Sequence, residues 1–234
     1  CILTIRNLCR ALDKPLVLLF DEIDCLADST LISFLRQIRE GYIRRAFTPF
    51  AHSLALVGMR DVRDYKASVR DGQTTLGSAS PFNIKTESLT LRGFTRDEIA
   101  ELYAQHTDET GQVFPDEVID WVFEQTQGQP WLVNAVAREM VQKMGENDPS
   151  VELTLDMAKQ AVKNIILRRE THIDSLLERL KEPRVQHVIE PMMLGESDKY
   201  DPLSDEIQYV TDLGLIKSDR GRVSPANPIY AEVI

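Results

Sequence analysis

The 234-residue sequence predicts an α/β protein that begins with a parallel sheet, continues as a set of helices, and ends in a small domain of helices and a hairpin. Two apolar runs, Leu16–Phe20 and Leu54–Met59, each lead directly into charged residues, which is typical of buried strands in a parallel sheet. From Gly93 onward, apolar residues recur at helical spacing. Near the end of the chain, two short segments flank a turn at Gly221, which predicts a hairpin.

Composition excludes several classes of protein. Hydrophobic residues make up 43% of the chain and charged residues 27%, which is ordinary for a globular protein. No apolar stretch reaches the roughly 18 residues of a membrane span, and the first residues lack a signal-peptide pattern. We therefore expect a cytoplasmic protein without membrane contact. The three cysteines and the scattered histidines lack the spacing of metal ligands.

The net charge of -10 is unevenly distributed along the chain. Residues 1–92 contain 13 Lys and Arg against 10 Asp and Glu, whereas the remainder contains 14 against 27. Nonspecific nucleic-acid binding needs basic residues that neutralise phosphates, so the acidic part should repel nucleic acid. Any contact with nucleic acid should therefore be local.

The first apolar run ends in the acidic residues Asp21, Glu22 and Asp24. Because the run is unbroken, we expect a strand that is buried on both faces. Ligands of parallel sheets bind beyond the carboxyl ends of the strands, where Asp21 and Glu22 emerge. These residues suit phosphoryl transfer from a nucleotide, with Asp21 as a ligand of Mg²⁺ and Glu22 as the group that polarises the attacking water. The pattern is typical of a Walker B element; the alternative is an acidic strand end that faces solvent or caps the next helix.

The second apolar run ends in a cation, Arg60. If the two strands are neighbours, Arg60 lies beside Asp21 and Glu22 and is placed to sense a terminal phosphate. The alternative is a surface ion pair with Asp61 or Asp64.

Helices are expected before and between the two runs, from Ile2 and over residues 29–45. The polar face of the second helix carries arginines, which favours a solvated surface. The sharper alternative is that Arg44 or Arg45 contacts a phosphate or a neighbouring subunit, as an arginine finger does. Residues 68–83 should form a long loop, and Ser88–Leu91 a short strand that closes the sheet.

A helical region over residues 93–170 follows. Thr95 and Glu98 have the spacing of a capping box, and Pro115 opens the next helix. His106 lies on an apolar stripe, which favours a packed or surface histidine over a metal ligand. The sequence Gly128-Gln129-Pro130 then breaks the chain before a third helix. A C-cap glycine followed by a helix-starting proline accounts for this break by itself.

Residues 171–234 complete the chain with helices over 184–193 and 204–213, a cap at Gly214 and a hairpin that returns at Arg222–Ser224. Helices followed by a hairpin predict a winged-helix domain. The helix before the hairpin contains Asp205, Glu206 and Asp212 and no basic residue, which disfavours insertion into a DNA groove. We expect this domain to pack against other protein domains.

Taken in order, Asp21-Glu22, Arg60 and Gly128-Gln129-Pro130 resemble the AAA+ ATPases, and most closely their STAND branch of signalling ATPases. The stretches Gly128–Asn134 and Ala226–Ile234 resemble bacterial ATP-binding proteins with an AAA-like domain. The resemblance implies the C-terminal half of a RecA-like P-loop NTPase core (1–92), a helical lid (93–170) and a winged helix (171–234). It also implies ATP and Mg²⁺ as cofactors, with Asp21 serving Mg²⁺, Glu22 and Arg60 as catalytic carboxylate and sensor, and Pro130 near the adenine.

One departure from that family is a missing phosphate-binding loop. A P-loop needs G-x-x-x-x-G-K-[ST], and none of the 11 glycines is followed by lysine. The family carries this loop upstream of Walker B, so we expect the chain to be a fragment whose P-loop lies outside it. Such a fragment should bind ATP weakly or not at all. The competing hypothesis is a non-catalytic module that binds a protein partner or itself and retains a vestigial Walker B.

Overall fold

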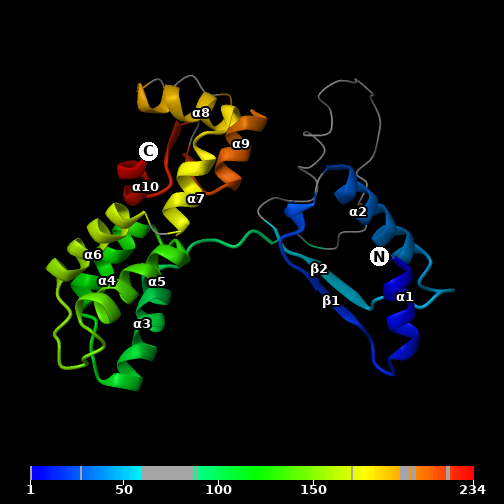
Figure 1. The fold of residues 1–234 in the computed structure, drawn as a ribbon, viewed down its shortest axis with the longest axis horizontal. Coiled ribbons are helices and arrows are strands. Elements are labelled where there is room, and N and C mark those ends of the chain that lie inside the picture. The colour runs from blue at the N-terminus through cyan, green and yellow to red at the C-terminus, as the bar shows by residue number, and fades with distance from the viewer. Residues whose placement is uncertain are drawn as a thin grey trace. The chain divides into compact units, whose positions relative to one another are not determined.

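The structure is a computed structural model that describes residues 2–26, 28–58, 87, 89–169, 171–195, 201, 204–219 and 222–234. The chain divides into two compact units, residues 1–90 and 91–234 (Figure 1). Each unit has its own cluster of buried hydrophobic residues, so each is described by itself.

The first unit consists of two helices, a short 3₁₀ turn and two strands. In chain order these are α1 (Ile2–Ala11), β1 (Val17–Phe20), η1 (Ile23–Cys25), α2 (Asp28–Ile43) and β2 (Ser53–Leu56). The strands pair in parallel, with Val17 opposite Ser53 and Phe20 opposite Leu56. This confirms the predicted parallel neighbours. A connection through a helix is what parallel pairing requires, and α2 supplies it.

Among the described residues, one face of the β1–β2 pair is packed and the other is exposed. Leu18, Phe20 and Leu54 pack against the buried cluster of this unit, which includes residues of α1 and α2. The alternate residues face outward, and the side chains of Val17 and Leu19 are 57% and 76% exposed. The prediction of a strand buried on both faces was therefore wrong for the described residues. An apolar run indicates that a strand can be buried, but it does not show whether one or both faces of the sheet are covered by other elements.

Residues 89–91 follow without regular secondary structure. Leu89 and Leu91 are largely exposed, so the short strand predicted over Ser88–Leu91 is absent at these described positions.

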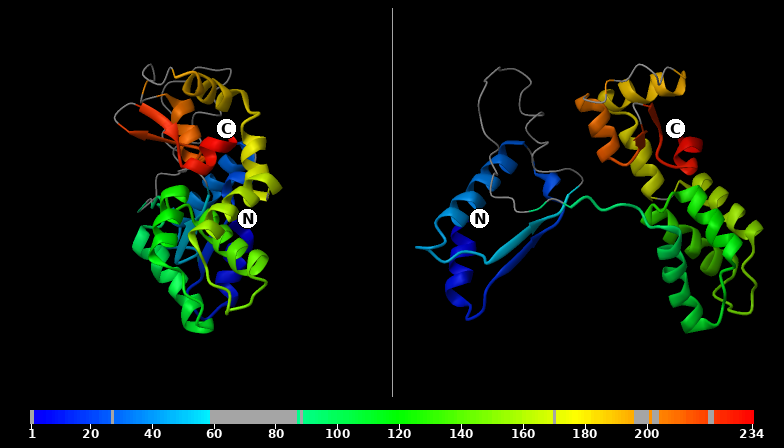
Figure 2. Two further views of the ribbon diagram at one scale, coloured as in Figure 1. Left: turned by 90° about the vertical axis from the view of Figure 1, so that its left-hand side faces the viewer. Right: turned by 180° about the vertical axis from the view of Figure 1, so that it is seen from behind.

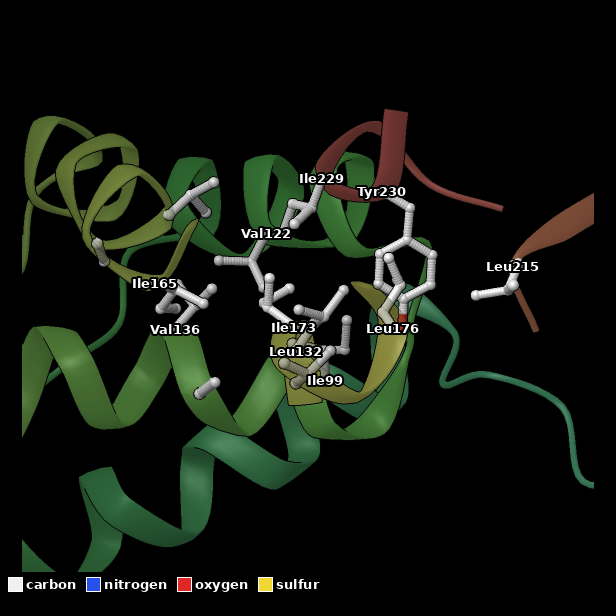
Figure 3. Packing of buried hydrophobic residues seen from close by; sticks show 14 of the residues in the cluster. Ile99, Val122, Leu132, Val136, Ile165, Ile173, Leu176, Leu215, Ile229 and Tyr230 are labelled. Carbon is white, nitrogen blue, oxygen red and sulfur yellow. The ribbon is translucent and has the colours of Figure 1, made fainter. Parts of the chain in front are cut away.

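The second unit begins with five helical segments. They are α3 (Arg96–Thr110), α4 (Asp116–Thr126), α5 (Pro130–Arg138), the π-helical segment η4 (Glu139–Met144) and α6 (Leu155–Arg168). The predicted capping box is present: the Thr95 hydroxyl accepts from the amide of Glu98, and the Glu98 carboxylate accepts from the amide of Thr95. Apolar residues on one side of each helix form a shared core, of which Figure 3 shows a part.

The unit continues with α7 (Thr171–Arg179), α8 (Pro183–Met193), α9 (Asp205–Asp212), β3 (Ile216–Asp219), β4 (Arg222–Pro225) and α10 (Pro228–Val233). Strands β3 and β4 pair antiparallel with Ile216 opposite Pro225, which confirms the predicted hairpin; they lie beside α9 in Figure 2. Residues from α7, α8 and α10 belong to the same buried cluster as those of α3–α6. Within the described ranges, none of the helices is both long and apolar enough to cross a membrane.

A buried carboxylate ties η4 to α6. Glu139 is 2% exposed, and its carboxylate accepts hydrogen bonds from Asn164 (2.8 Å) and Arg168 (2.7 Å). Arg168 is itself half-exposed and partners this buried charge from α6. Arg169 instead ends α6 in a left-handed conformation.

We predict that Arg168→Ala lowers the free energy of unfolding by about 2 kcal/mol, because it leaves Glu139 buried with one partner fewer. Urea unfolding monitored by circular dichroism measures the change. Lys181→Ala is the matched control, since its pair with Glu178 is exposed on both sides and should contribute less than about 0.5 kcal/mol. Equal effects of the two variants would contradict a structural role for the Glu139–Arg168 pair.

Candidate functional site

Asp21 and Glu22 protrude at the carboxyl end of β1. On one side of them, the amide of Val57 donates to the carbonyl of Phe20 (2.8 Å). On the other side, the amide of Ile23 donates to the carbonyl of Val57 (3.1 Å). Because both bonds go to one residue of the neighbouring strand's extension, the two acidic residues are looped out between them. Both side chains are exposed, at the edge where parallel sheets bind ligands.

The backbone of Glu22 has a left-handed conformation, with φ 51° and ψ 40°. This conformation costs a non-glycine residue about 1 kcal/mol. Local hydrogen bonds hold it: Asp21 Oδ1 accepts from the Glu22 amide (2.9 Å), and the Glu22 carbonyl accepts from the amide of Cys25 (2.9 Å). The thiol of Cys25 also lies 3.6 Å from Glu22 Oε2. The sequence did not predict the contributions of Val57 and Cys25.

The donor atoms fit Mg²⁺. Exposed carboxylate oxygens are hard ligands, and Mg²⁺ typically takes one or two carboxylates and completes its shell with water and phosphate oxygens. The described residues contain no group of three or more His, Cys, Asp or Glu side chains that would form a complete protein cage. Asp21 is therefore suited to a magnesium ion that arrives with a phosphorylated ligand.

The structure describes two of the three arginines predicted to contact a phosphate or a subunit. Arg60 lies outside the described residues. Arg44 pairs with Glu40 at 3.5 Å, and the guanidinium of Arg45 lies 3.6 Å from the ring centre of Tyr42. These local partners favour the solvated-surface interpretation of this helix face.

The turn Gly128-Gln129-Pro130 in the second unit is tightly constrained. Gly128 has φ +75°, and a Cβ at this position would lie 1.9 Å from the carbonyl oxygen of Phe94. The amide of Phe94 donates to the carbonyl of Gly128 at 2.7 Å. No side chain fits between two backbones this close. The requirement for glycine at this position is therefore steric, and the C-cap of α4 is Gln127 rather than the predicted Gly128.

The next residues start α5. The side chain of Gln129 caps the helix by accepting from the amide of Leu132 at 2.6 Å, and Pro130 occupies the first turn with an exposed side chain. This arrangement confirms the helix-starting proline and presents a rigid apolar ring at a helix N-terminus.

Arg92 anchors the segment 92–95, which is hydrogen-bonded to this turn through Phe94. Its guanidinium donates to the carbonyl of Gly93 (2.8 Å) and to the carboxylate of Glu98 (2.6 Å). The hydrogen bond from Arg92, together with the amide of Thr95, lowers the pKa of Glu98 to about 2. The sequence predicted the capping box but not Arg92, whose guanidinium binds the Glu98 carboxylate of that box.

Comparison with known proteins gives a likeness to solved structures. No family model and no curated protein matches the sequence. Among solved structures, the chain is similar to the Walker-type ATPase PABY2304 of Pyrococcus abyssi, with a TM-score of 0.59 and 15% sequence identity. The match covers 98% of this chain and 65% of that structure. The chain therefore has an α/β fold like that of a Walker-type P-loop ATPase and spans about two thirds of that protein's length.

We predict that Gly128→Ala lowers the free energy of unfolding by at least about 3 kcal/mol, because the new methyl group overlaps the backbone of Phe94. Gly111→Ala is the matched control. Gly111 has a similar φ of +78° but nothing within 4 Å of a Cβ, so only the backbone strain of about 1 kcal/mol remains. Thermal and urea unfolding compare the two variants. A loss at Gly128 no larger than that at Gly111 would contradict the close approach.

Proposed function

We propose that this chain is part of an ATP-binding and ATP-hydrolysing protein of the AAA+/STAND type. The observation that carries the proposal is the pair Asp21 and Glu22, looped out at the carboxyl edge of a parallel strand pair in a fold like that of a Walker-type ATPase. In this proposal Asp21 serves Mg²⁺, which neutralises charge on the phosphates. Glu22 orients and polarises the attacking water. Arg60 acts as the sensor of the terminal phosphate.

The second unit supplies a helical lid and a winged-helix-like domain in this proposal, over residues 93–170 and 171–234. The exposed Pro130, held rigid at the start of α5, is the residue that packs near the adenine. The order α8, α9, β3, β4 supports the winged helix. The phosphate-binding loop is supplied from outside these residues, because the sequence contains no Gly-Lys pair.

The alternative function is a non-catalytic module that binds a protein partner. It is favoured by one observation: α9, the helix before the hairpin, carries Asp205, Glu206 and Asp212 and no basic residue, so its surface suits a protein better than nucleic acid. In that case the strand end at Asp21 has no catalytic role.

Two calorimetric titrations separate these functions. ATP with Mg²⁺ is titrated into this chain and into the full-length protein that contains it. Binding by the full-length protein alone supports the proposed ATPase with an external P-loop. Binding by neither supports the interaction module.

We predict that Glu22→Gln in the full-length protein lowers kcat for ATP hydrolysis by roughly 100-fold or more, because the amide cannot polarise the water. ATP affinity should change little, since Gln keeps the shape of the side chain. Glu40→Gln is the control, because that exposed carboxylate pairs with Arg44 in the same unit. If the Glu22→Gln variant hydrolysed ATP as fast as the wild-type protein, Glu22 would not be the catalytic carboxylate.

A further inference from the structure

Three aromatic side chains connect α5, α7 and α10. The rings of Trp131 and His172 are stacked, with centroids 4.6 Å apart and planes 18° apart. His172 Nε2 lies 2.6 Å from the hydroxyl of Tyr230, and these two rings are also nearly parallel. The second contact joins residues 58 positions apart in the sequence. The three side chains therefore form a continuous link from the start of α5 to the last helix.

The link is uncharged near neutral pH. Burial lowers the pKa of His172 below its ordinary value and raises the pKa of Tyr230 to about 12. A neutral imidazole and a protonated phenol share one hydrogen bond, and the imidazole retains a flat face for the indole of Trp131.

One end of this link is firmly fixed. Tyr230 is 3% exposed and belongs to the main core of the unit, into which α10 projects it beside Ile229 (Figure 3). Its amide donates to the side chain of Asn227, the buried N-cap of α10 (2.9 Å). The position of His172 is therefore set by a residue that has little freedom to move.

The other end lies next to the turn of the candidate site. Trp131 is half-buried and directly follows the exposed Pro130 at the start of α5. The same first turn contains the cap between Gln129 and the amide of Leu132. Holding the indole in place thus restricts the orientation of this turn.

We infer that Trp131 is a positioning residue for the nucleotide and that His172 and Tyr230 hold it in place. The inference rests on the proposed function, in which the base packs against Pro130. The stack fixes Pro130 before the nucleotide arrives, so part of the ordering entropy is already lost in the free protein. The last helix of the chain thereby contributes to ATP affinity without touching ATP.

Steady-state ATP hydrolysis by the full-length protein tests this inference. Trp131→Ala and His172→Ala should raise KM for ATP roughly threefold to tenfold, the loss expected for one stacked pair. Tyr230→Phe, which removes one hydroxyl, should raise KM about threefold. In all three variants kcat should stay within about twofold, because the link acts on binding of the nucleotide and not on the groups proposed to carry out the chemical step. Trp131→Phe should restore much of the affinity, since it keeps an aromatic face.

The matched control is Tyr209→Phe. Tyr209 is another buried tyrosine of the same unit, and its hydroxyl donates to Glu182 at 2.7 Å. If Tyr209→Phe and Tyr230→Phe changed KM equally, or if Trp131→Ala left KM unchanged, the inference would be overturned.

Amide hydrogen exchange tests the role of Trp131 without a measurement of ATP hydrolysis. Trp131→Ala should accelerate exchange at Leu132 and at Phe94, whose amides bond to this turn, whereas Trp121→Ala should not. Unchanged exchange at both amides would overturn the inference. A wild-type protein that binds no ATP would contradict the proposed function itself, and exchange at these amides would still decide whether Trp131 holds the turn.

Discussion

Two backbone hydrogen bonds of Val57 determine the geometry of the acidic site. They bracket Asp21 and Glu22, so the chain must bulge between them and push both carboxylates out of the strand edge. These bonds exist because β1 and β2 run parallel and in register. The register in turn depends on Leu18, Phe20 and Leu54 packing against α1 and α2. A change in that packing would move the carboxylates, although the core residues do not touch them.

The turn in the second unit depends on the same kind of constraint. Gly128 and Phe94 approach so closely that only backbone atoms fit, and a short hydrogen bond joins them. Arg92 then fixes the crossing segment to the capping box of α3. In both units, backbone contacts hold the local geometry, and the side chains proposed to meet the ligand are exposed. This is the arrangement expected where a site must be rigid before it binds.

The sequence predicted the elements whose signals are local. The helix from residue 96 followed from Thr95 and Glu98, and the parallel pairing followed from two apolar runs with a helix between them. The sequence did not predict the features that depend on residues far apart in the chain. The exposure of Leu19 depends on which layers cover the sheet, and the stack of Trp131 on His172 joins separate helices. The left-handed backbone of Glu22 also had no local signal, because glycine or asparagine normally marks that conformation.

The adjacency of Asp21 and Glu22 explains why their chemistry would require a metal ion. Consecutive carboxylates repel each other and would repel a triphosphate, and among the described residues neither has a basic partner. The Glu22 amide compensates only one oxygen of Asp21. In the proposed function, a divalent cation held by Asp21 would offset this repulsion, and Glu22 would remain available as a base toward water. By the same electrostatics, the proposed full-length ATPase should bind the magnesium complex of ATP more tightly than free ATP.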